Sequence, residues 1–121
     1  MRNTVRRLLI ASVLSLLGVS AGAHAFLSQA VPPVGGVVPV APREVRLTFT
    51  EGIEPAFSRI ELATAEGQPI GTAPVTVDPR DNTQLVLPLP PLAPGRYRVK
   101  WRVVSIDTHP TEGDYTFEIR P

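Results

Sequence analysis

Two histidines are the residues of this sequence best suited to chemistry, because an imidazole near neutral pH can bind a metal ion or move a proton. His24 follows a stretch typical of a cleaved leader, and His109 lies in the segment Asp107-Thr108-His109-Pro110. If His24 were the first residue after cleavage, its α-amine and its imidazole could chelate one ion. A second imidazole and a carboxylate would complete a donor set that suits tetragonal Cu(II).

The first 23 residues are typical of a secretory signal peptide, with a basic start, an apolar run and small residues at the end. The apolar run is too short to predict a stable membrane span, although an uncleaved N-terminal anchor is the alternative. We therefore expect residues 1–23 to be removed and residues 24–121 to form one domain. A Sec-type signal of this kind directs the domain to the periplasm.

Two A-x-A patterns compete as the cleavage point. Ala21-Gly22-Ala23 would leave His24 first, whereas Ala23-His24-Ala25 would leave Phe26 first and remove the proposed ligand. We favour the first, because the apolar run ends nearer to it. The leader carries three arginines and no acid, so its removal changes the formal charge from +1 to −2. No basic stripe with interleaved aromatic residues remains, which argues against nucleic-acid binding.

Sulfur ligands are absent from the predicted domain. The sequence contains no cysteine, and its single methionine is Met1. This excludes a blue-copper centre, which needs a cysteine thiolate, and argues against a Cu(I) site. A domain of this size without disulfides must be stabilised by a packed core.

Strict alternation of apolar and polar residues predicts strands that are buried on one face. In the clearest segment, Tyr97, Val99, Trp101 and Val103 alternate with basic residues. Similar alternation occurs at residues 45–50, 59–62, 85–89 and 115–120, and turn signals occur at residues 32–36, 66–67, 78–82 and 94–95. No segment shows a convincing 3.6-residue apolar period. Several short strands at this spacing predict an all-β fold, a Greek-key antiparallel β-sandwich.

The position of Tyr97 supports the prediction of a Greek-key sandwich. Tyr97 follows Pro94-Gly95 at the start of the longest alternating segment, where Greek-key sandwiches place a tyrosine corner. We favour that structural role over a redox or ligand role for Tyr97, and we interpret Trp101 as a core residue. The proline-rich residues 88–94 are interpreted as a crossover between the two sheets.

The spacing around His109 favours a shared ligand site. Asp107 and His109 are two residues apart, so in an extended segment their side chains project to the same side. Pro110 biases His109 toward an extended backbone. In a sandwich, the first strand and a turn after a late strand can meet at one end, which would bring His24 to this pair. An Asp-x-His pair alone is a weak signal, because surface histidines are common and metal sites are rare.

Residues 97–113 resemble the C-terminal signature of the CopC/PcoC family of periplasmic copper-resistance proteins. The shared pattern is Y-x-V-x-W-x-x-x-S-x-D-x-H-P-x-x-G. The segment His24-Ala25-Phe26-Leu27 and residues 45–51 are similar to that family as well, so the resemblance covers the mature chain. It implies a β-sandwich of the cupredoxin/immunoglobulin-like type.

The resemblance also implies a ligand set for one Cu(II) per chain, the histidine brace. His24 would give its amine and a ring nitrogen, Asp107 a carboxylate oxygen and His109 a ring nitrogen. Family members often have a glutamate where Glu51 stands. Glu51 would be an axial ligand, a group that orients the ligands, or a hydrogen-bond partner of the N-terminal amine.

The chain departs from some members of that family, which carry a second, methionine-rich site for Cu(I). A mature chain without methionine resembles the subgroup with a single Cu(II) site. The resemblance further implies a partner, an inner-membrane copper transporter of the CopD type. We expect a monomer.

The function predicted from the sequence is Cu(II) sequestration, delivery or resistance, and we expect no enzymatic activity. One rival is a copper monooxygenase with the same brace, but such chemistry needs an open coordination position, which Asp107 would close. A second rival is an immunoglobulin-like interaction module that binds no metal. Zinc is an alternative ion, although an amine donor and the Irving–Williams order favour Cu(II).

Overall fold

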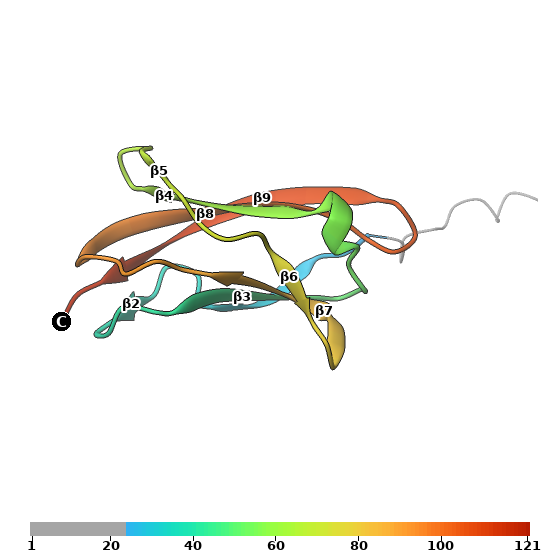
Figure 1. The fold of residues 1–121 in the computed structure, drawn as a ribbon, viewed down its shortest axis with the longest axis horizontal. Helices are drawn as coiled ribbons and strands as arrows, with labels where there is room; N and C mark the ends of the chain where they lie inside the picture. Colours follow the sequence, from blue (N-terminus) through green and yellow to red (C-terminus); the bar gives the residue numbers. More distant parts are fainter. Residues whose placement is uncertain (1–23) are drawn as a thin grey trace, which may run out of the picture.

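The structure is a computed structural model that describes residues 24–121, so the predicted signal peptide in residues 1–23 lies outside the described residues. Two β-sheets pack face to face (Figure 1). The four-stranded sheet contains, in spatial order, β1 (Leu27–Val31), β3 (Glu44–Phe49), β7 (Asp81–Pro88) and β6 (Thr76–Asp78). The five-stranded sheet contains β2 (Val37–Val38), β9 (Pro110–Ile119), β8 (Gly95–Val104), β4 (Arg59–Thr64) and β5 (Pro69–Ile70).

The predicted β-sandwich is confirmed, with one correction to its antiparallel character. The two-residue strand β2 pairs with β9 in parallel, through Val37 with Glu118 and Val38 with Ile119. The chain reaches this position by crossing from β1, at the edge of one sheet, to the edge of the other. A short 3₁₀ turn, η3 (Pro55–Phe57), follows β3. Over the described part of the chain, no helix has the length and apolar character needed to cross a bilayer.

The alternating residues of the sequence form the core between the sheets. Most of the buried side chains come from β3, β4, β7, β8 and β9, the strands that the alternation predicts. They include Val45, Leu47, Phe49, Ile60, Leu62, Leu85, Leu87, Val99, Val103, Phe117 and Ile119. Trp101 departs from its interpretation as a core residue, because it is only partly buried and packs against this cluster. Its ring meets Phe49 edge-on, with centroids 6.3 Å apart. The residue opposite it on β9 is Gly113, and the indole lies directly against this glycine.

Two tyrosine hydroxyls connect the core to the connecting loops. Tyr97 donates a hydrogen bond to the carbonyl oxygen of Ala93 at 2.6 Å, which confirms the tyrosine corner. Tyr115 donates to the carbonyl oxygen of Pro32 at 2.8 Å, and burial raises the pKa of its hydroxyl. The proline-rich residues 88–94 carry the chain from β7 in one sheet to β8 in the other, which confirms the predicted crossover.

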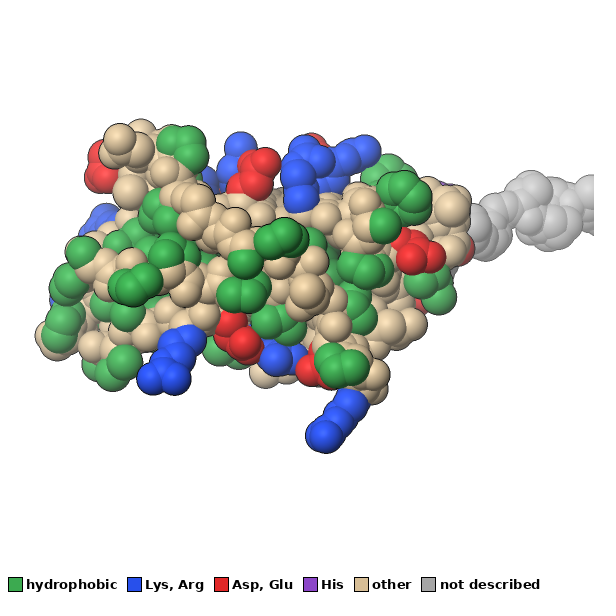
Figure 2. Space-filling view, in the orientation of Figure 1, with side chains coloured by type: hydrophobic (Ala, Val, Ile, Leu, Met, Phe, Trp, Pro, Cys, Tyr) green, Lys and Arg blue, Asp and Glu red, His purple; other side chains and the backbone are tan. Residues whose placement is uncertain are grey.

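The outward face of the five-stranded sheet is charged, and Figure 2 shows Lys and Arg side chains gathered above it. Most of these cations have acidic neighbours. The ion pairs are Arg59–Glu61, Arg96–Glu118, Arg98–Asp114 and Arg102–Glu112. Exposed pairs of this kind contribute about 0–1 kcal/mol each, so we interpret the face as a solvated surface.

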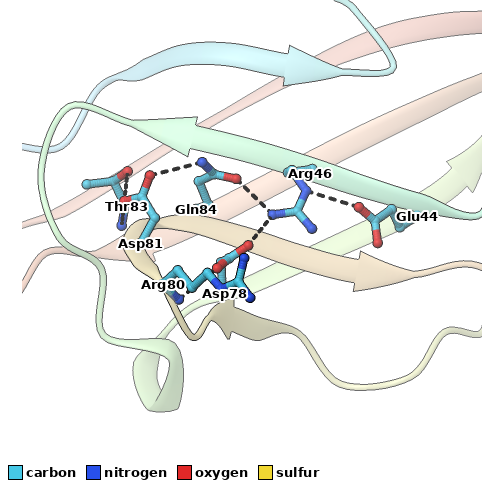
Figure 3. Close-up of polar contacts among 7 residues, drawn as sticks. All are labelled: Glu44, Arg46, Asp78, Arg80, Asp81, Thr83 and Gln84. Carbon is cyan, nitrogen blue, oxygen red and sulfur yellow. Dashed lines mark hydrogen bonds and ion pairs between the residues drawn. The ribbon is translucent and has the colours of Figure 1, made fainter.

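The outward face of the four-stranded sheet carries a denser polar network (Figure 3). The guanidinium of Arg46 on β3 binds Glu44 at 3.0 Å, Asp78 at 2.7 Å and Gln84 at 2.8 Å. A backbone N–H from Arg80, then Arg46, lowers the pKa of Asp78. Because Asp78 lies on β6 and Gln84 on β7, Arg46 joins three neighbouring strands.

The close contact between the Trp101 ring and the backbone of Gly113 predicts that only glycine fits at position 113. A Cβ atom built on Gly113 would lie 2.4 Å from Cζ2 of Trp101, so the indole would have to move out of its contacts. We expect Gly113→Ala to destabilise the fold by about 1–3 kcal/mol, as overpacking does. Urea unfolding followed by the fluorescence of the single tryptophan measures this loss.

Gly71→Ala is the matched control, because a Cβ on Gly71 would meet no atom within 4 Å. It should change the free energy of unfolding by less than about 0.5 kcal/mol. Equal effects of the two substitutions would contradict the proposed packing.

The network around Arg46 predicts a loss of stability in acid. A carboxyl whose folded pKa is depressed stabilises the fold above its unfolded pKa, which is 3.8 for Asp78, and this stability is lost as the pH falls through the folded pKa. We expect the free energy of unfolding to fall between about pH 5 and pH 2, and to fall less steeply in Asp78→Asn. Urea titrations across this pH range test it, with the exposed Glu66→Gln as control. A slope in Asp78→Asn as steep as that of the parent protein would contradict the prediction.

Candidate metal centre

The turn between β8 and β9 carries both residues of the predicted Asp-x-His pair. The β8–β9 ladder ends with Val104 opposite Pro110, and residues 105–109 close the turn. The Thr108 N–H donates to the carbonyl oxygen of Ser105 at 2.8 Å. Thr108 itself has a φ of 74°, a left-handed conformation that costs a residue with a branched side chain some free energy. The turn is therefore a tight, defined structure.

Ser105 lies at the centre of this turn, with a side chain that is fully buried. Its hydroxyl donates a short hydrogen bond to Oδ1 of Asp107 and accepts one from the backbone N–H of His109 at 3.3 Å. The Ser105 hydroxyl and, to a lesser degree, His109 lower the pKa of Asp107. Asp107 is therefore held in place and ionised near neutral pH, in the state that binds a cation.

A neighbouring loop supports the turn. The Ile106 N–H donates to the carbonyl oxygen of Gly52 at 3.0 Å, and the Glu54 N–H donates to that of Val104 at 2.9 Å. Ile53 and Ser105 form an isolated antiparallel bridge between these hydrogen bonds. The residues after β3 thus fix the position of the turn against the four-stranded sheet.

The N-terminal segment brings His24 to the same end of the sandwich. Figure 1 shows the first described residues beside the β8–β9 turn. The imidazoles of His24 and His109 lie edge to face, with ring centroids 5.0 Å apart and planes at 89°. Phe26 flanks His24 at 6.2 Å. Although 84 residues separate the histidines along the chain, the fold makes them neighbours.

Asp107 contacts His109 directly. Its Oδ1 lies 3.4 Å from Nδ1 of His109, and about half of each side chain is exposed to solvent, 47% and 46% respectively. The pair is therefore accessible from outside the molecule. The structure thus brings His24 to His109 and Asp107 to His109.

Glu51 lies at the same end but apart from these contacts. It follows the last residue pairing of β3 and is partly buried. Within the described residues, it makes no hydrogen bond or ion pair with His24, Asp107 or His109. Its predicted role as an axial ligand or orienting group stays a prediction.

In residues 24–121, no three His, Cys, Asp or Glu side chains converge as a group that could hold a metal ion. The predicted ligands therefore form two contacting pairs that share His109. The fourth predicted donor is no side chain at all, because the α-nitrogen of His24 is a peptide nitrogen in the full sequence. Cleavage after Ala23 would turn it into an amine.

Three residues that build this end of the molecule have no functional signal in the sequence, namely Ser105, Thr50 and Thr111. Ser105 was visible only as one letter of the family pattern. The Thr111 hydroxyl donates to the carbonyl oxygen of Ala25 at 2.8 Å, and the Phe26 N–H donates to the Thr50 hydroxyl at 2.9 Å. Because these contacts join residues that are 86 and 24 positions apart, no local sequence pattern around either threonine predicts them.

Known proteins resemble the chain over its whole length. Protein YobA of Escherichia coli K12 is 38% identical over 124 residues, which cover 99% of this chain and 100% of YobA. Copper resistance protein C of Xanthomonas campestris pv. juglandis is 37% identical over 112 residues, covering 88% of this chain and 87% of that protein.

Solved structures agree with these relatives. CopC from Methylosinus trichosporium OB3b superposes with a TM-score of 0.77 at 37% identity, covering 81% of this chain and 95% of that one. PcoC of Escherichia coli, a methionine-rich copper resistance protein, superposes with a TM-score of 0.71 at 36% identity, covering 81% and 100%. The CopC domain family matches residues 27–120, and we conclude that the chain belongs to it.

Proposed function

We propose that this protein binds one Cu(II) per chain in the periplasm and sequesters or delivers it, in copper resistance or copper supply. The ligands would be the α-amine and imidazole of His24, the imidazole of His109 and the carboxylate of Asp107. Relatives named copper resistance protein C support the copper assignment. A relative in Bacillus subtilis that is 28% identical carries the name copper transport protein CutJ.

The observation that carries this proposal is the contact between the two imidazoles. A metal–nitrogen bond of about 2 Å puts an imidazole centroid roughly 3 Å from the ion. Two rings on one ion therefore have centroids about 4–6 Å apart, depending on the angle between their bonds. The observed 5.0 Å falls inside this range, so the separation of the two rings is compatible with a shared ion.

The donor types favour Cu(II) over its rivals. Amine and imidazole nitrogens with one carboxylate suit a tetragonal ion, and Cu(II) binds such a set more tightly than Zn²⁺ does. A site for Cu(I) would need soft sulfur ligands, and no methionine or cysteine follows Met1. The second, methionine-rich type of site therefore has no ligands in this domain.

The packing of Ala25 supports a mature chain that begins at His24. Ala25 is 0% exposed, and its carbonyl oxygen accepts the hydrogen bond from Thr111. A chain that began at Phe26 would leave the space of Ala25 empty and the Thr111 hydroxyl without this acceptor. Cleavage after Ala23 keeps both, and it creates the amine that the brace requires.

The ligand count favours transport or storage over catalysis. If Asp107 fills the fourth equatorial position, no such position remains for oxygen, which a monooxygenase must bind. An inner-membrane transporter of the CopD type is the partner that we propose to receive the ion. The exposure of His109 and Asp107 suits such a transfer, because a partner's ligands can reach the ion directly.

The first prediction from this function is stoichiometric Cu(II) binding by the exported protein. The full chain, exported and processed in bacteria, should have an intact mass that begins at His24 and should bind one Cu(II) with nitrogen hyperfine structure in its EPR spectrum. Asp107→Asn should weaken binding by more than about tenfold, the lower limit for losing even an indirect partner.

Glu66→Gln is the control for charge, because Glu66 is an exposed carboxylate in the β4–β5 turn. It should bind copper as the parent protein does. A correctly processed chain that leaves Cu(II) in bulk solution would refute the function, as would Asp107→Asn binding as tightly as the parent.

The second prediction is release of the ion in acid. Amine and imidazole donors bind Cu(II) only without their protons, so affinity should fall as the pH drops from about 7 to about 4. Competition titrations with a chelator at several pH values measure this fall. An affinity that does not change over this range would exclude nitrogen donors of these types.

A further inference from the structure

The three residues that precede β1 are held between the two sheets. The Ala25 side chain is fully buried in the core, whereas those of His24 and Phe26 on either side of it are exposed. The backbone thus enters the sandwich at Ala25 and leaves His24 at the surface. What holds this backbone decides where the imidazole of His24 lies.

Two threonine hydroxyls hold it, one from each sheet. Thr111 on β9 donates its hydroxyl hydrogen to the carbonyl oxygen of Ala25 at 2.8 Å. Thr50, directly after β3, accepts the Phe26 N–H on its hydroxyl at 2.9 Å, and its own N–H donates to the Phe26 carbonyl oxygen at 2.9 Å. The ladder between β1 and β3 begins only at Leu27, so these bonds act ahead of the sheet.

The two hydrogen bonds differ in their exposure to solvent. The amide of Phe26 is exposed and could be solvated by water, so the Thr50 bond is not needed to satisfy a buried donor. Thr111 is partly buried, and it joins the N-terminal segment to the strand that directly follows His109. Both bonds therefore act on the position of the segment, and the Thr111 bond couples His24 to the β8–β9 turn.

We propose that Thr50 and Thr111 are positioning residues that hold His24 against His109 and thereby set the copper affinity of the site. This inference rests on the proposed function. Without the hydroxyls, residues 24–26 would sample other backbone conformations, and each binding event would have to restrict them again. Groups that hydrogen-bond a metal ligand directly contribute about 10–100-fold to affinity, and we expect the lower end of this range for hydroxyls that act on the neighbouring residues.

The test compares four variants of the full chain, exported, processed and checked by intact mass. Thr111→Val and Thr50→Val remove a hydroxyl at nearly constant shape, and Thr111→Ser keeps the hydroxyl. Thr116→Val is the matched control, because Thr116 lies on the same strand and its hydroxyl makes no hydrogen bond among the described residues. Chelator competition gives the Cu(II) affinity, EPR reports the ligand geometry, and the copper-free protein gives the nuclear Overhauser effect between the two imidazoles.

We expect Thr111→Val to lose about tenfold or more in affinity, to change the EPR spectrum and to lose the Overhauser effect between His24 and His109. Thr50→Val should show a smaller loss, and Thr111→Ser and Thr116→Val should resemble the parent protein. Because Thr111→Ser keeps the hydroxyl but loses the methyl group, its recovery of affinity separates positioning from general packing.

Two results would overturn the inference. One is an unchanged affinity and Overhauser effect in Thr111→Val, and the other is an equal loss of affinity in Thr116→Val. A parent protein that binds no Cu(II) would refute the proposed function instead. In that case the Overhauser effect in copper-free protein still decides whether the threonines position His24.

Discussion

The register of the ladder between β8 and β9 is the constraint on which the site depends. Ten residue pairs join the two strands, from Gly95 with Ile119 to Val104 with Pro110. A slip by one residue would turn Tyr115, Phe117 and Ile119 away from the core, because side chains alternate along a strand. The free energy of burying these residues therefore selects one register. That register ends the ladder at Pro110 and leaves Asp107 and His109 in the turn.

Trp101 adds a steric contribution to the same register. Its ring lies over Gly113, and the next residues on either side of Gly113 are Glu112 and Asp114, whose side chains a shifted ladder would bring beneath the indole. The glycine of the family pattern is thus explained by packing. It stands four residues from His109, so a residue that is not among the predicted ligands helps to determine where His109 lies.

The site requires both sheets, because its histidines reach it by different routes. His109 arrives through the five-stranded sheet. His24 is reached through Phe26, which is bonded to Thr50 after β3 of the other sheet, and through Ala25, which is bonded to Thr111 on β9. The packing of the two sheets therefore contributes to the separation of the two imidazoles, together with these bonds. This dependence explains how two histidines at opposite ends of the domain sequence can lie side by side without a disulfide or a shared loop.

Much of this arrangement could be predicted from the sequence, and what could not has a physical reason. Alternation predicted the five longer strands, and the Pro94-Gly95 corner predicted the role of Tyr97, because these signals lie within a few adjacent residues. The strands β2, β5 and β6 are too short to show alternation, and the parallel pairing of β2 depends on where the chain crosses. The hydrogen bonds of Ser105, Thr50 and Thr111 could not be predicted, because serine and threonine are common in strands and turns. Only the tertiary fold selects the partners of their hydroxyls.

The position of the site also bears on what the copper would do for the protein. The core packs closely on its own, with Val45, Leu47 and Leu85 fully buried, and in residues 24–121 no buried side-chain nitrogen or oxygen lacks a hydrogen-bond partner. Nothing in this packing requires an ion to complete it. The predicted ligands Asp107 and His109 lie at the end of the sandwich and are half exposed, so an ion bound there could enter and leave while the core stays intact. Ion binding need therefore not be coupled to folding of the domain, in contrast to small metal domains that fold only around their ion.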